Sequence, residues 1–213
     1  MTNEEYKQLS IKEFTKAAKI YESNNAGIYE ICKKDYPDIL AELESEPFND
    51  LLDAGCGPGP MITLLYEKYP EKHYTGIDLT PEMIYQAQKK NLPHTQFVVG
   101  DCENLPFEEN SFDVIICANS FHHYPDPEAF FASVKRCLRP HGRLILRDYT
   151  SNNKLITWFV NHIEFPLVNL VGHGDVKMAT REMIEEYCQH TGLILEKFEA
   201  RKGMRMHCVI RKS

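Results

Sequence analysis

The sequence predicts an α/β protein with a doubly wound, mostly parallel sheet of seven strands, the last strand antiparallel, and an N-terminal helical cap. Three observations lead to this prediction. Strand and helix patterns alternate from residue 49 onward, as in a parallel sheet with helices on both faces. Several strands are continuous apolar runs, such as Val114-Ile115-Ile116, which suits burial on both faces. A glycine-rich turn follows the first strand, at the edge where such sheets bind ligands.

Local patterns place the individual elements. Residues 3–45 are predicted to be helical because apolar residues recur at helical spacing, and Pro37 is expected to divide them. Proline or a capping residue marks the start of each later helix, near Pro60, Thr80, Asp126-Pro127 and Thr180. The predicted strands are Leu51-Leu52, 73–78, 95–99, 112–118, 143–148, 193–198 and 204–210.

Composition and charge exclude several classes of protein. The 213 residues suit a single domain, and the net charge of −7 comes without any basic stripe, so we expect no nucleic-acid partner. The chain shows neither a signal peptide nor the roughly 20 apolar residues of a membrane span, so we expect no membrane partner. Seven cysteines without a Cys-x-x-Cys pair indicate a reducing, cytoplasmic location.

The strongest signal is the glycine-rich turn at residues 53–59, Asp-Ala-Gly-Cys-Gly-Pro-Gly. Glycines without a Cβ let the backbone approach a bound nucleoside closely. Such a turn is not specific by itself, but aspartates end the next two predicted strands. Asp78, 19 residues after Gly59, can accept hydrogen bonds from both ribose hydroxyls, and Asp101 can accept one from an adenine amino group. The pattern predicts an adenosine cofactor.

The residues around the turn favour one kind of adenosine cofactor. A dinucleotide needs backbone N–H donors aimed at its pyrophosphate, and Pro58 and Pro60 remove two of them. Three aspartates, Asp53, Asp78 and Asp101, surround the same place and would repel an anion. S-adenosylmethionine carries a sulfonium and an ammonium and no phosphate. The sequence therefore favours S-adenosylmethionine over a nicotinamide or flavin dinucleotide.

These motifs resemble those of the class I S-adenosylmethionine-dependent methyltransferases, in particular the small-molecule group related to ubiquinone and menaquinone methyltransferases. The resemblance runs from about Phe14 to Arg211, and the family's Rossmann-like fold agrees with the predicted sheet. One departure is His141, which stands where the family usually has glycine and leaves the geometry of that turn open. Five motifs occur in the family's order, at residues 53–59, 76–79, 100–107, 112–127 and 136–142.

The resemblance implies roles in holding the adenosine. Asp53 would lie near the ammonium group of the methionine part, and Asp78 would hold the ribose diol. Leu79 would pack on the adenine. Asp101 would take the adenine amino group, and the backbone N–H of Cys102 would reach a ring nitrogen.

Four further residues complete the implied cofactor site. Gly55 and Gly57 would line the methionine part, with Asn119 beside it at the end of the fourth strand. Tyr21, in an N-terminal arrangement similar to the family's helical cap, would close over the cofactor; packing in the core is an equal alternative.

Catalytic residues are harder to predict, because methyl transfer needs a base only when the acceptor must lose a proton. His122 is the catalytic candidate, just past the fourth strand, although a locally packed loop histidine explains it as well. We expect no metal site at His122 and His123, because neighbouring side chains diverge. The segment His173-Gly174-Asp175 is predicted to be loop.

The sequence therefore predicts in-line methyl transfer to a small-molecule acceptor. A protein that binds the cofactor without turnover is the main alternative, and a nicotinamide oxidoreductase is disfavoured by the two prolines. The end of the fourth strand lacks the Asn/Asp-Pro-Pro-Tyr/Phe motif of many nitrogen methyltransferases. We divide residues 1–213 into a helical cap (1–46), a cofactor-binding core (47–149), a substrate-side insertion (150–180), and a closing helix and strands (181–213).

The apolar stretch Leu155–Val171 in the insertion has three possible roles. It can wall off the acceptor site, with Trp158 and Phe159 foremost; it can pack as core; or it can form a homodimer interface.

Overall fold

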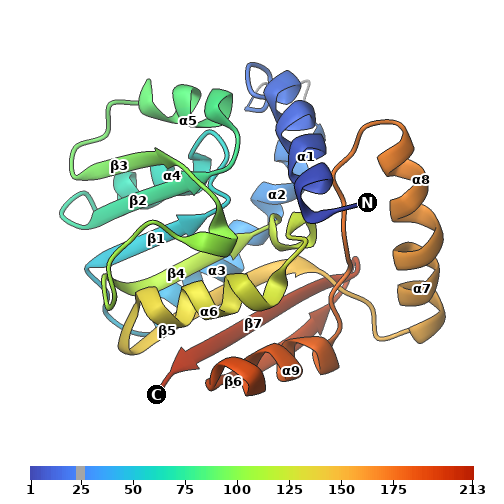
Figure 1. Ribbon diagram of the computed structural model, residues 1–213. Coiled ribbons are helices and arrows are strands. Elements are labelled where there is room, and N and C mark those ends of the chain that lie inside the picture. The colour runs from blue at the N-terminus through green and yellow to red at the C-terminus, as the bar shows by residue number, and fades with distance from the viewer. Residues whose placement is uncertain (23–26) are drawn as a thin grey trace.

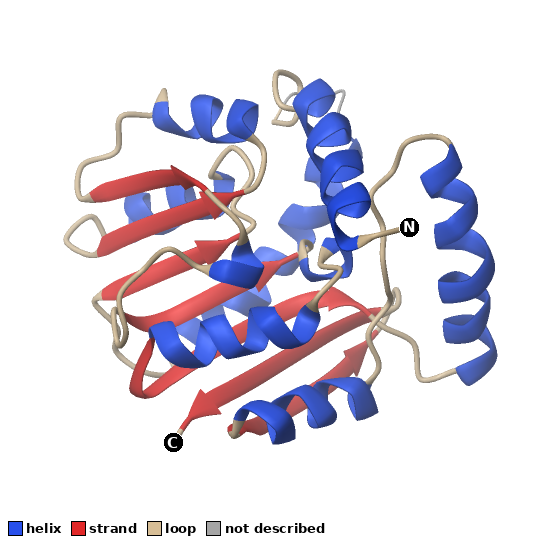
Figure 2. Ribbon diagram, in the orientation of Figure 1, coloured by secondary structure: helices blue, strands red, loops and turns tan. Residues whose placement is uncertain are grey.

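The computed structural model describes residues 1–22 and 27–213. A seven-stranded sheet crosses this part of the chain in the order β3-β2-β1-β4-β5-β7-β6 (Figures 1 and 2). Strands β1 to β5 pair in parallel, and β7 runs antiparallel to both β5 and β6. The predicted doubly wound fold with an antiparallel last strand is confirmed. The strands are β1 (Asp50–Ala54), β2 (His73–Asp78), β3 (Thr95–Val99), β4 (Phe112–Ala118), β5 (Leu138–Tyr149), β6 (Leu193–Arg201) and β7 (Arg205–Lys212).

Helices cover both faces of the sheet, because strand side chains alternate between two apolar cores. On β1, Leu52 packs into the core that helices α6 and α9 complete, while Leu51 packs into the core under α3, α4 and α5. The helices are α1 (Asn3–Ala17), α2 (Gly27–Cys32), α3 (Tyr36–Glu44), α4 (Pro60–Lys68), α5 (Pro81–Gln88), α6 (Pro127–Cys137), α7 (Lys154–Phe159), α8 (Phe165–Leu170) and α9 (Arg181–Thr191), with the short helices η1 (Lys33–Asp35), η2 (Cys102–Asn104), η3 (Phe121–His123) and η4 (Val160–Glu164).

Capping residues set the helix ends largely as predicted. The side chain of Asp126 accepts a hydrogen bond from the Ala129 N–H at 3.0 Å, and Thr180 caps α9 through the Met183 N–H. Thr80 occupies the cap position of α5, but its hydroxyl forms no capping bond. Pro37 marks a division among the N-terminal helices as expected, because the α-helix pattern gives way to η1 just before it and α3 begins at Tyr36. It lies in the first turn of α3, where its missing N–H costs no helical bond.

The turn at His141 forms in spite of the missing glycine. His141 adopts a left-handed conformation with φ of 64°, which a glycine would adopt without strain. The residue lies in a bulge of β5, between the pairs Phe112–Leu138 and Val114–Arg143, and the strand begins at Leu138 rather than at Arg143 as predicted. The departure from the family pattern therefore leaves the sheet intact.

The insertion forms a helical arm at one side of the molecule, where α7 and α8 stand apart from the sheet (orange in Figure 1). Val160 and Phe165 are buried against Met178 and form a small core of their own. Leu170 is 83 % exposed and Trp158 is 55 % exposed. The alternative that Trp158 packs as core is therefore wrong. None of the described helices is long and apolar enough to cross a membrane.

Candidate functional site

The candidate site lies at the carboxyl ends of β1 and β4, where the strand order reverses and ligands bind in folds of this kind. Helix α1 runs beside this edge of the sheet (Figure 1). Two cavities adjoin there, with volumes of about 470 and 570 Å³. The structure brings all nine residues predicted to bind the cofactor into their walls: Tyr21, Asp53, Gly55, Gly57, Asp78, Leu79, Asp101, Cys102 and Asn119.

The glycine-rich turn needs glycine at two of its positions for different reasons. Gly55 has φ of 77°, and a Cβ there would lie 1.9 Å from Oγ of Ser120. Gly57 has φ of 53°, and a Cβ there would meet nothing within 4 Å, since the cavity begins at this point. The backbone N–H of Gly55 donates to the carbonyl of Ile77 at 2.8 Å, which fixes the turn against β2. The turn thus offers open backbone to a ligand.

Asp78 holds the turn as well as facing the cavity. Its Oδ2 accepts a hydrogen bond from the Gly57 N–H at 2.9 Å, and its Oδ1 accepts one from the Thr80 N–H at 2.8 Å. Burial raises the pKa of this carboxyl in spite of the two backbone donors. The sequence predicted the carboxylate's position but not these two bonds to the backbone.

Asp53 lies beside Asp78 and is only 3 % exposed. Burial, reinforced by repulsion from Asp78, raises the pKa of Asp53 to about 7. Asp53 forms no ion pair with any residue that the structure describes. A ligand that brings a positive charge, such as the ammonium and sulfonium of S-adenosylmethionine, fits this pair of buried carboxyls.

The far end of the cavity is closed by a lysine that sequence reasoning missed. Nζ of Lys7, on α1, lies 2.7 Å from Oδ2 of Asp101 and also pairs with Glu103. The other oxygen of Asp101 accepts the Glu103 N–H at 2.9 Å and caps η2. Cys102 is buried in η2, and burial raises its thiol pKa to about 12. No local signal marks Lys7, because the contact joins residues 94 positions apart.

Asn119 is fixed by a buried charge network. It takes a left-handed conformation with φ of 56°, and its Nδ2 donates to Asp35 at 3.0 Å. Asp35 also accepts from Nε of Arg147 at 2.7 Å and pairs with Arg205, which bonds to Asn119 in turn. Sequence reasoning missed these three charged residues, which come together only through β5, β7 and η1.

Tyr21 lies between the cofactor cavity and a third cavity of about 1040 Å³. Its hydroxyl lies 3.6 Å from Sγ of Cys32, and burial raises the pKa of the phenol. The third cavity has mostly apolar walls that come from α1, α2, the helical arm, the loop before α9 and the turn between β6 and β7: Phe14, Ile31, Val160, Phe165, Met178 and Met204. It shares Asn119 and His123 with the cofactor cavity.

The helical arm reaches this third cavity with other residues than expected. Val160 and Phe165 line it. Trp158 and Phe159, predicted to wall off the acceptor, are about half exposed and lie outside its walls. The helical period explains the difference, because the face of the arm that carries Val160 and Phe165 turns toward the body.

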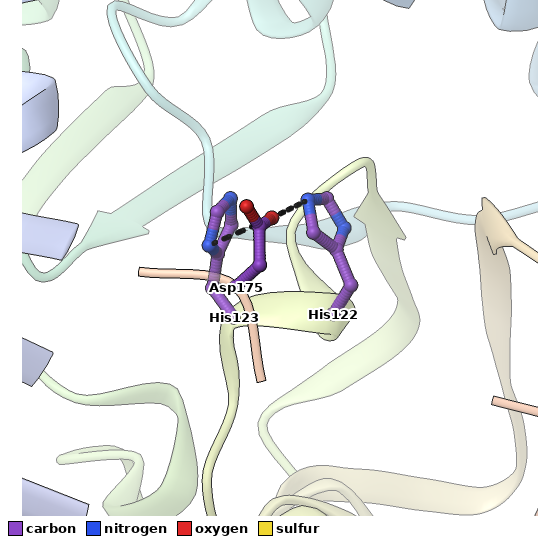
Figure 3. Close-up of side chains that lie close together, drawn as sticks. All are labelled: His122, His123 and Asp175. Atoms are coloured by element: carbon purple, nitrogen blue, oxygen red, sulfur yellow. Dashed lines mark ion pairs between the residues drawn. The ribbon is translucent and has the colours of Figure 1, made fainter. Parts of the chain in front are cut away.

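His122 and His123 lie together at the wall of the third cavity, on η3 (Figure 3). Nδ1 of His122 lies 2.7 Å from Oδ1 of the buried Asp148. Asp175 lies between the two rings, with its Oδ1 3.5 Å from Nε2 of His122 and 3.8 Å from Nδ1 of His123. The expectation that the two neighbouring side chains diverge is wrong. Nitrogen and oxygen atoms of His122, His123 and Asp175 lie within 4.8 Å of one another and can hold a metal ion.

The loop before α9 delivers Asp175. The residues 173–175 are loop, as predicted, but backbone N–H groups of Val176 and Lys177 donate to the His122 carbonyl at 2.8 and 3.2 Å. These bonds fix the loop against η3. Because the loop is 50 residues further along the chain than η3, local pattern reasoning had no means of placing Asp175 between the histidines.

The pKa values of the two histidines are shifted in opposite directions. Burial disfavours a charged His122, but the adjacent Asp148 outweighs burial and raises the pKa of His122. Burial, together with the neighbouring His122, lowers the pKa of His123 to about 4. His123 is therefore a neutral imidazole near pH 7.

The fold and the glycine-rich turn resemble those of class I S-adenosylmethionine-dependent methyltransferases. Residues 52–146 match the family model described as "Methyltransferase domain", and this stretch of the chain belongs to that family. S-adenosylmethionine is the methyl donor of the family.

Curated relatives carry more specific names. The chain is 42 % identical over 112 residues to a phthiotriol/phenolphthiotriol dimycocerosates methyltransferase of Mycobacterium leprae, covering 52 % of this chain and 42 % of that protein. It is 39 % identical over 152 residues to the corresponding methyltransferase 1 of Mycobacterium ulcerans, covering 62 % and 56 %. The chain thus spans about half the length of the curated relatives it matches.

Solved structures share the fold at low sequence identity. An S-adenosylmethionine-dependent methyltransferase from Mesorhizobium loti superposes with a TM-score of 0.68 at 18 % identity, over 84 % of this chain and 97 % of that one. The [4+2]-cyclase SpnF superposes with a TM-score of 0.67 at 16 % identity, over 82 % and 78 %. The fold therefore accommodates more than one kind of chemistry, and the function has to be argued from the site.

Proposed function

We propose that this protein transfers a methyl group from S-adenosylmethionine to a small, largely apolar acceptor molecule. The observation that carries the proposal is the apolar cavity of about 1040 Å³ that adjoins the cofactor cavity and shares Tyr21, Asn119 and His123 with it. Two such compartments with a common wall are what a two-substrate transfer requires. The names of the relatives, which specify dimycocerosates, support an apolar acceptor.

In this proposal the predicted cofactor residues hold the donor. Asp53 would neutralise its ammonium group, Asp78 would bind the ribose hydroxyls, and Leu79 would pack on the adenine. Asp101 would reach the adenine amino group once Lys7 yields one of its carboxylate oxygens. The donor supplies an electrophilic methyl group on a sulfonium. The chain's own contribution is to align the acceptor with that methyl group and to exclude water.

His122 is the catalytic candidate on the acceptor side. Because Nδ1 bonds to Asp148, its Nε2 can carry a lone pair, and His122 lines the third cavity together with Asp175. We propose that this lone pair promotes loss of a proton from the acceptor's nucleophilic atom. His123, neutral and packed edge-on against Phe14, lies at the boundary between the two cavities.

The cellular location and the partners of the protein remain predictions. We expect a cytoplasmic location, in agreement with seven free, buried cysteines, and no nucleic-acid partner. The exposed apolar side chains Leu155, Leu167, Leu170 and Val171 on the helical arm support a homodimer interface more than a lid.

A radiolabel experiment tests the proposed function. Purified protein is incubated with methyl-labelled S-adenosylmethionine and a panel of hydroxylated apolar lipids, and label is counted in an organic extract. We expect transfer to at least one acceptor, with Asp78→Asn as the cofactor-site control. Cofactor binding without transfer to any acceptor would favour the non-catalytic alternative, and absence of cofactor binding would contradict the proposal altogether.

A further inference from the structure

We propose that His122, His123 and Asp175 form a binding site for a single divalent transition-metal ion, of the zinc type, at the wall of the acceptor cavity. This inference rests on the proposed function only for the identity of the cavity as the acceptor side. The metal site itself rests on the three side chains that Figure 3 shows facing one another.

The spacing of the ligand atoms suits a tetrahedral ion. Two ligands at about 2.0 Å from a tetrahedral zinc ion lie about 3.3 Å apart. Oδ1 of Asp175 lies 3.5 Å from Nε2 of His122 and 3.8 Å from Nδ1 of His123, and all three atoms lie within 4.8 Å of one another. Both distances to Asp175 are therefore within about 0.5 Å of the tetrahedral value, and the two histidine nitrogens would have to move closer together to complete the geometry.

Polar atoms of His123 and Asp175 have few other partners for hydrogen bonds. Nδ1 of His123 is buried and has no hydrogen-bond partner, which is costly for an imidazole unless something binds there. The carboxylate of Asp175 forms no hydrogen bond with any described residue, although it is half-buried. A cation among these atoms would satisfy both groups at once.

A second layer of contacts holds the ligands in place. His122 bonds through its other ring nitrogen to Asp148, the carboxylate–histidine arrangement that orients metal-binding histidines in many proteins. Asp148 is 1 % exposed and is held by backbone donors, the His122 N–H at 3.2 Å and the Tyr149 N–H. Backbone bonds from the loop of Asp175 to His122 fix the third ligand.

The ligand set also indicates what the ion would do. Three protein ligands leave the fourth position of a tetrahedral ion open, as in catalytic zinc sites, and here the cavity supplies the open side. Two imidazoles and one carboxylate select zinc-like ions over magnesium, which prefers oxygen ligands. With Nε2 of His122 bound to the ion, the ion would take over the part proposed above for that lone pair: an acceptor hydroxyl or thiol at the open position would lose its proton to water, and its oxygen or sulfur would keep the electron pair for attack on the methyl group.

Direct metal titration tests the site without reference to activity. Tag-free protein, freed of metal with EDTA and dialysed, is titrated with Zn²⁺ in competition with a chromophoric chelator, and with Co²⁺ by visible absorption. We expect one ion per chain and no comparable binding of Mg²⁺. Asp175→Asn and His123→Gln should each weaken Zn²⁺ binding at least tenfold, while His190→Asn, an exposed histidine paired with Glu128, should bind as the wild type does.

The outcomes separate this inference from the proposed function. Absence of stoichiometric Zn²⁺ binding, or equal binding by the trio variants and the His190→Asn control, overturns the metal site. Melting curves identify a variant that fails to fold, and the other trio variant then decides. Methyl transfer that survives complete chelation would overturn the ion's part in the reaction. Zn²⁺ binding by a protein that never transfers a methyl group would leave the site standing and contradict the proposed function.

Discussion

Gly57 donates its backbone N–H to Oδ2 of Asp78 across 2.9 Å, a bond that joins the turn after β1 to the end of β2. The Thr80 N–H takes the other oxygen of the same carboxylate. Asp78 therefore shapes the cofactor cavity before any ligand arrives.

Substitution of Asp78 should separate the two roles. Asp78→Asn keeps an acceptor oxygen and the shape of the side chain but loses the charge, and we expect weaker S-adenosylhomocysteine binding by about 1.5 to 3 kcal/mol, or roughly 10- to 150-fold. Asp78→Ala should also lower the free energy of unfolding by about 1 to 3 kcal/mol, because backbone donors lose their acceptor. Calorimetric titration and melting measure the two effects. Unchanged affinity in a folded Asp78→Asn variant would contradict the assignment.

S-adenosylhomocysteine should raise the melting temperature, and nicotinamide dinucleotides should not. A ligand that binds only the native state stabilises it by about 2.7 kcal/mol at a hundredfold excess over Kd. For a chain of this size that corresponds to a shift of roughly 5 to 10 °C. Differential scanning fluorimetry with each ligand checks the prediction, and an equal shift with NAD would refute the choice of cofactor.

The two glycines of the turn should respond differently to alanine. Gly55→Ala would place a Cβ 1.9 Å from Oγ of Ser120, so the turn must move and cofactor binding should fall at least tenfold. Gly57→Ala meets no protein atom and should cost only the backbone strain of a positive φ, about 1 kcal/mol of stability, while its Cβ enters the cavity and weakens cofactor binding without moving the turn. The two variants are compared by cofactor titration and melting. Equal losses of stability would show that the clash with Ser120 is relieved elsewhere.

Cofactor affinity should rise with pH through about 7. Burial raises the pKa of Asp53 to about 7, so the folded protein holds this carboxyl protonated where the unfolded chain has released the proton. Its burial therefore lowers the stability of the free protein progressively as pH rises from about 4 to 7. A cationic ligand favours the ionised carboxylate and should bind more tightly above that range. Titration of S-adenosylmethionine from pH 6 to 8 tests this, with Asp53→Asn expected to give a flatter profile.

Replacement by alanine of two aromatic residues of the helical arm should lower the stability of the protein by different amounts. Phe165 is buried with Val160 and Met178 and lines the third cavity, so Phe165→Ala should destabilise the protein by about 3 kcal/mol and impair methyl transfer. Trp158 is 55 % exposed, and Trp158→Ala should leave melting and cofactor affinity nearly unchanged. Sedimentation of the Trp158 variant, compared with the wild type, reports whether this face joins two copies of the chain. A strongly destabilised Trp158→Ala would contradict the exposed position.

Much of the fold was predictable because its signals are local. The predicted bounds of β2, β3 and β4 match those observed, and β4 contains a continuous apolar run. Thr180 and Asp126 marked helix starts through bonds to residues three positions away. Where a signal depended on packing, prediction failed. Trp158 was expected to wall off the acceptor, although its side chain is 55 % exposed.

By itself the sequence determined the doubly wound sheet and the glycine-rich turn, because strand ends are marked in their own few residues, and its resemblance to a family picked out nine residues that line two adjoining cavities. Only the tertiary structure decided what surrounds them. Lys7 meets Asp101, and Asp175 enters between His122 and His123, through contacts that span 94 and about 50 residues of chain. Such pairings depend on how helices and loops pack over the sheet edge, and neither propensity nor periodicity carries that information.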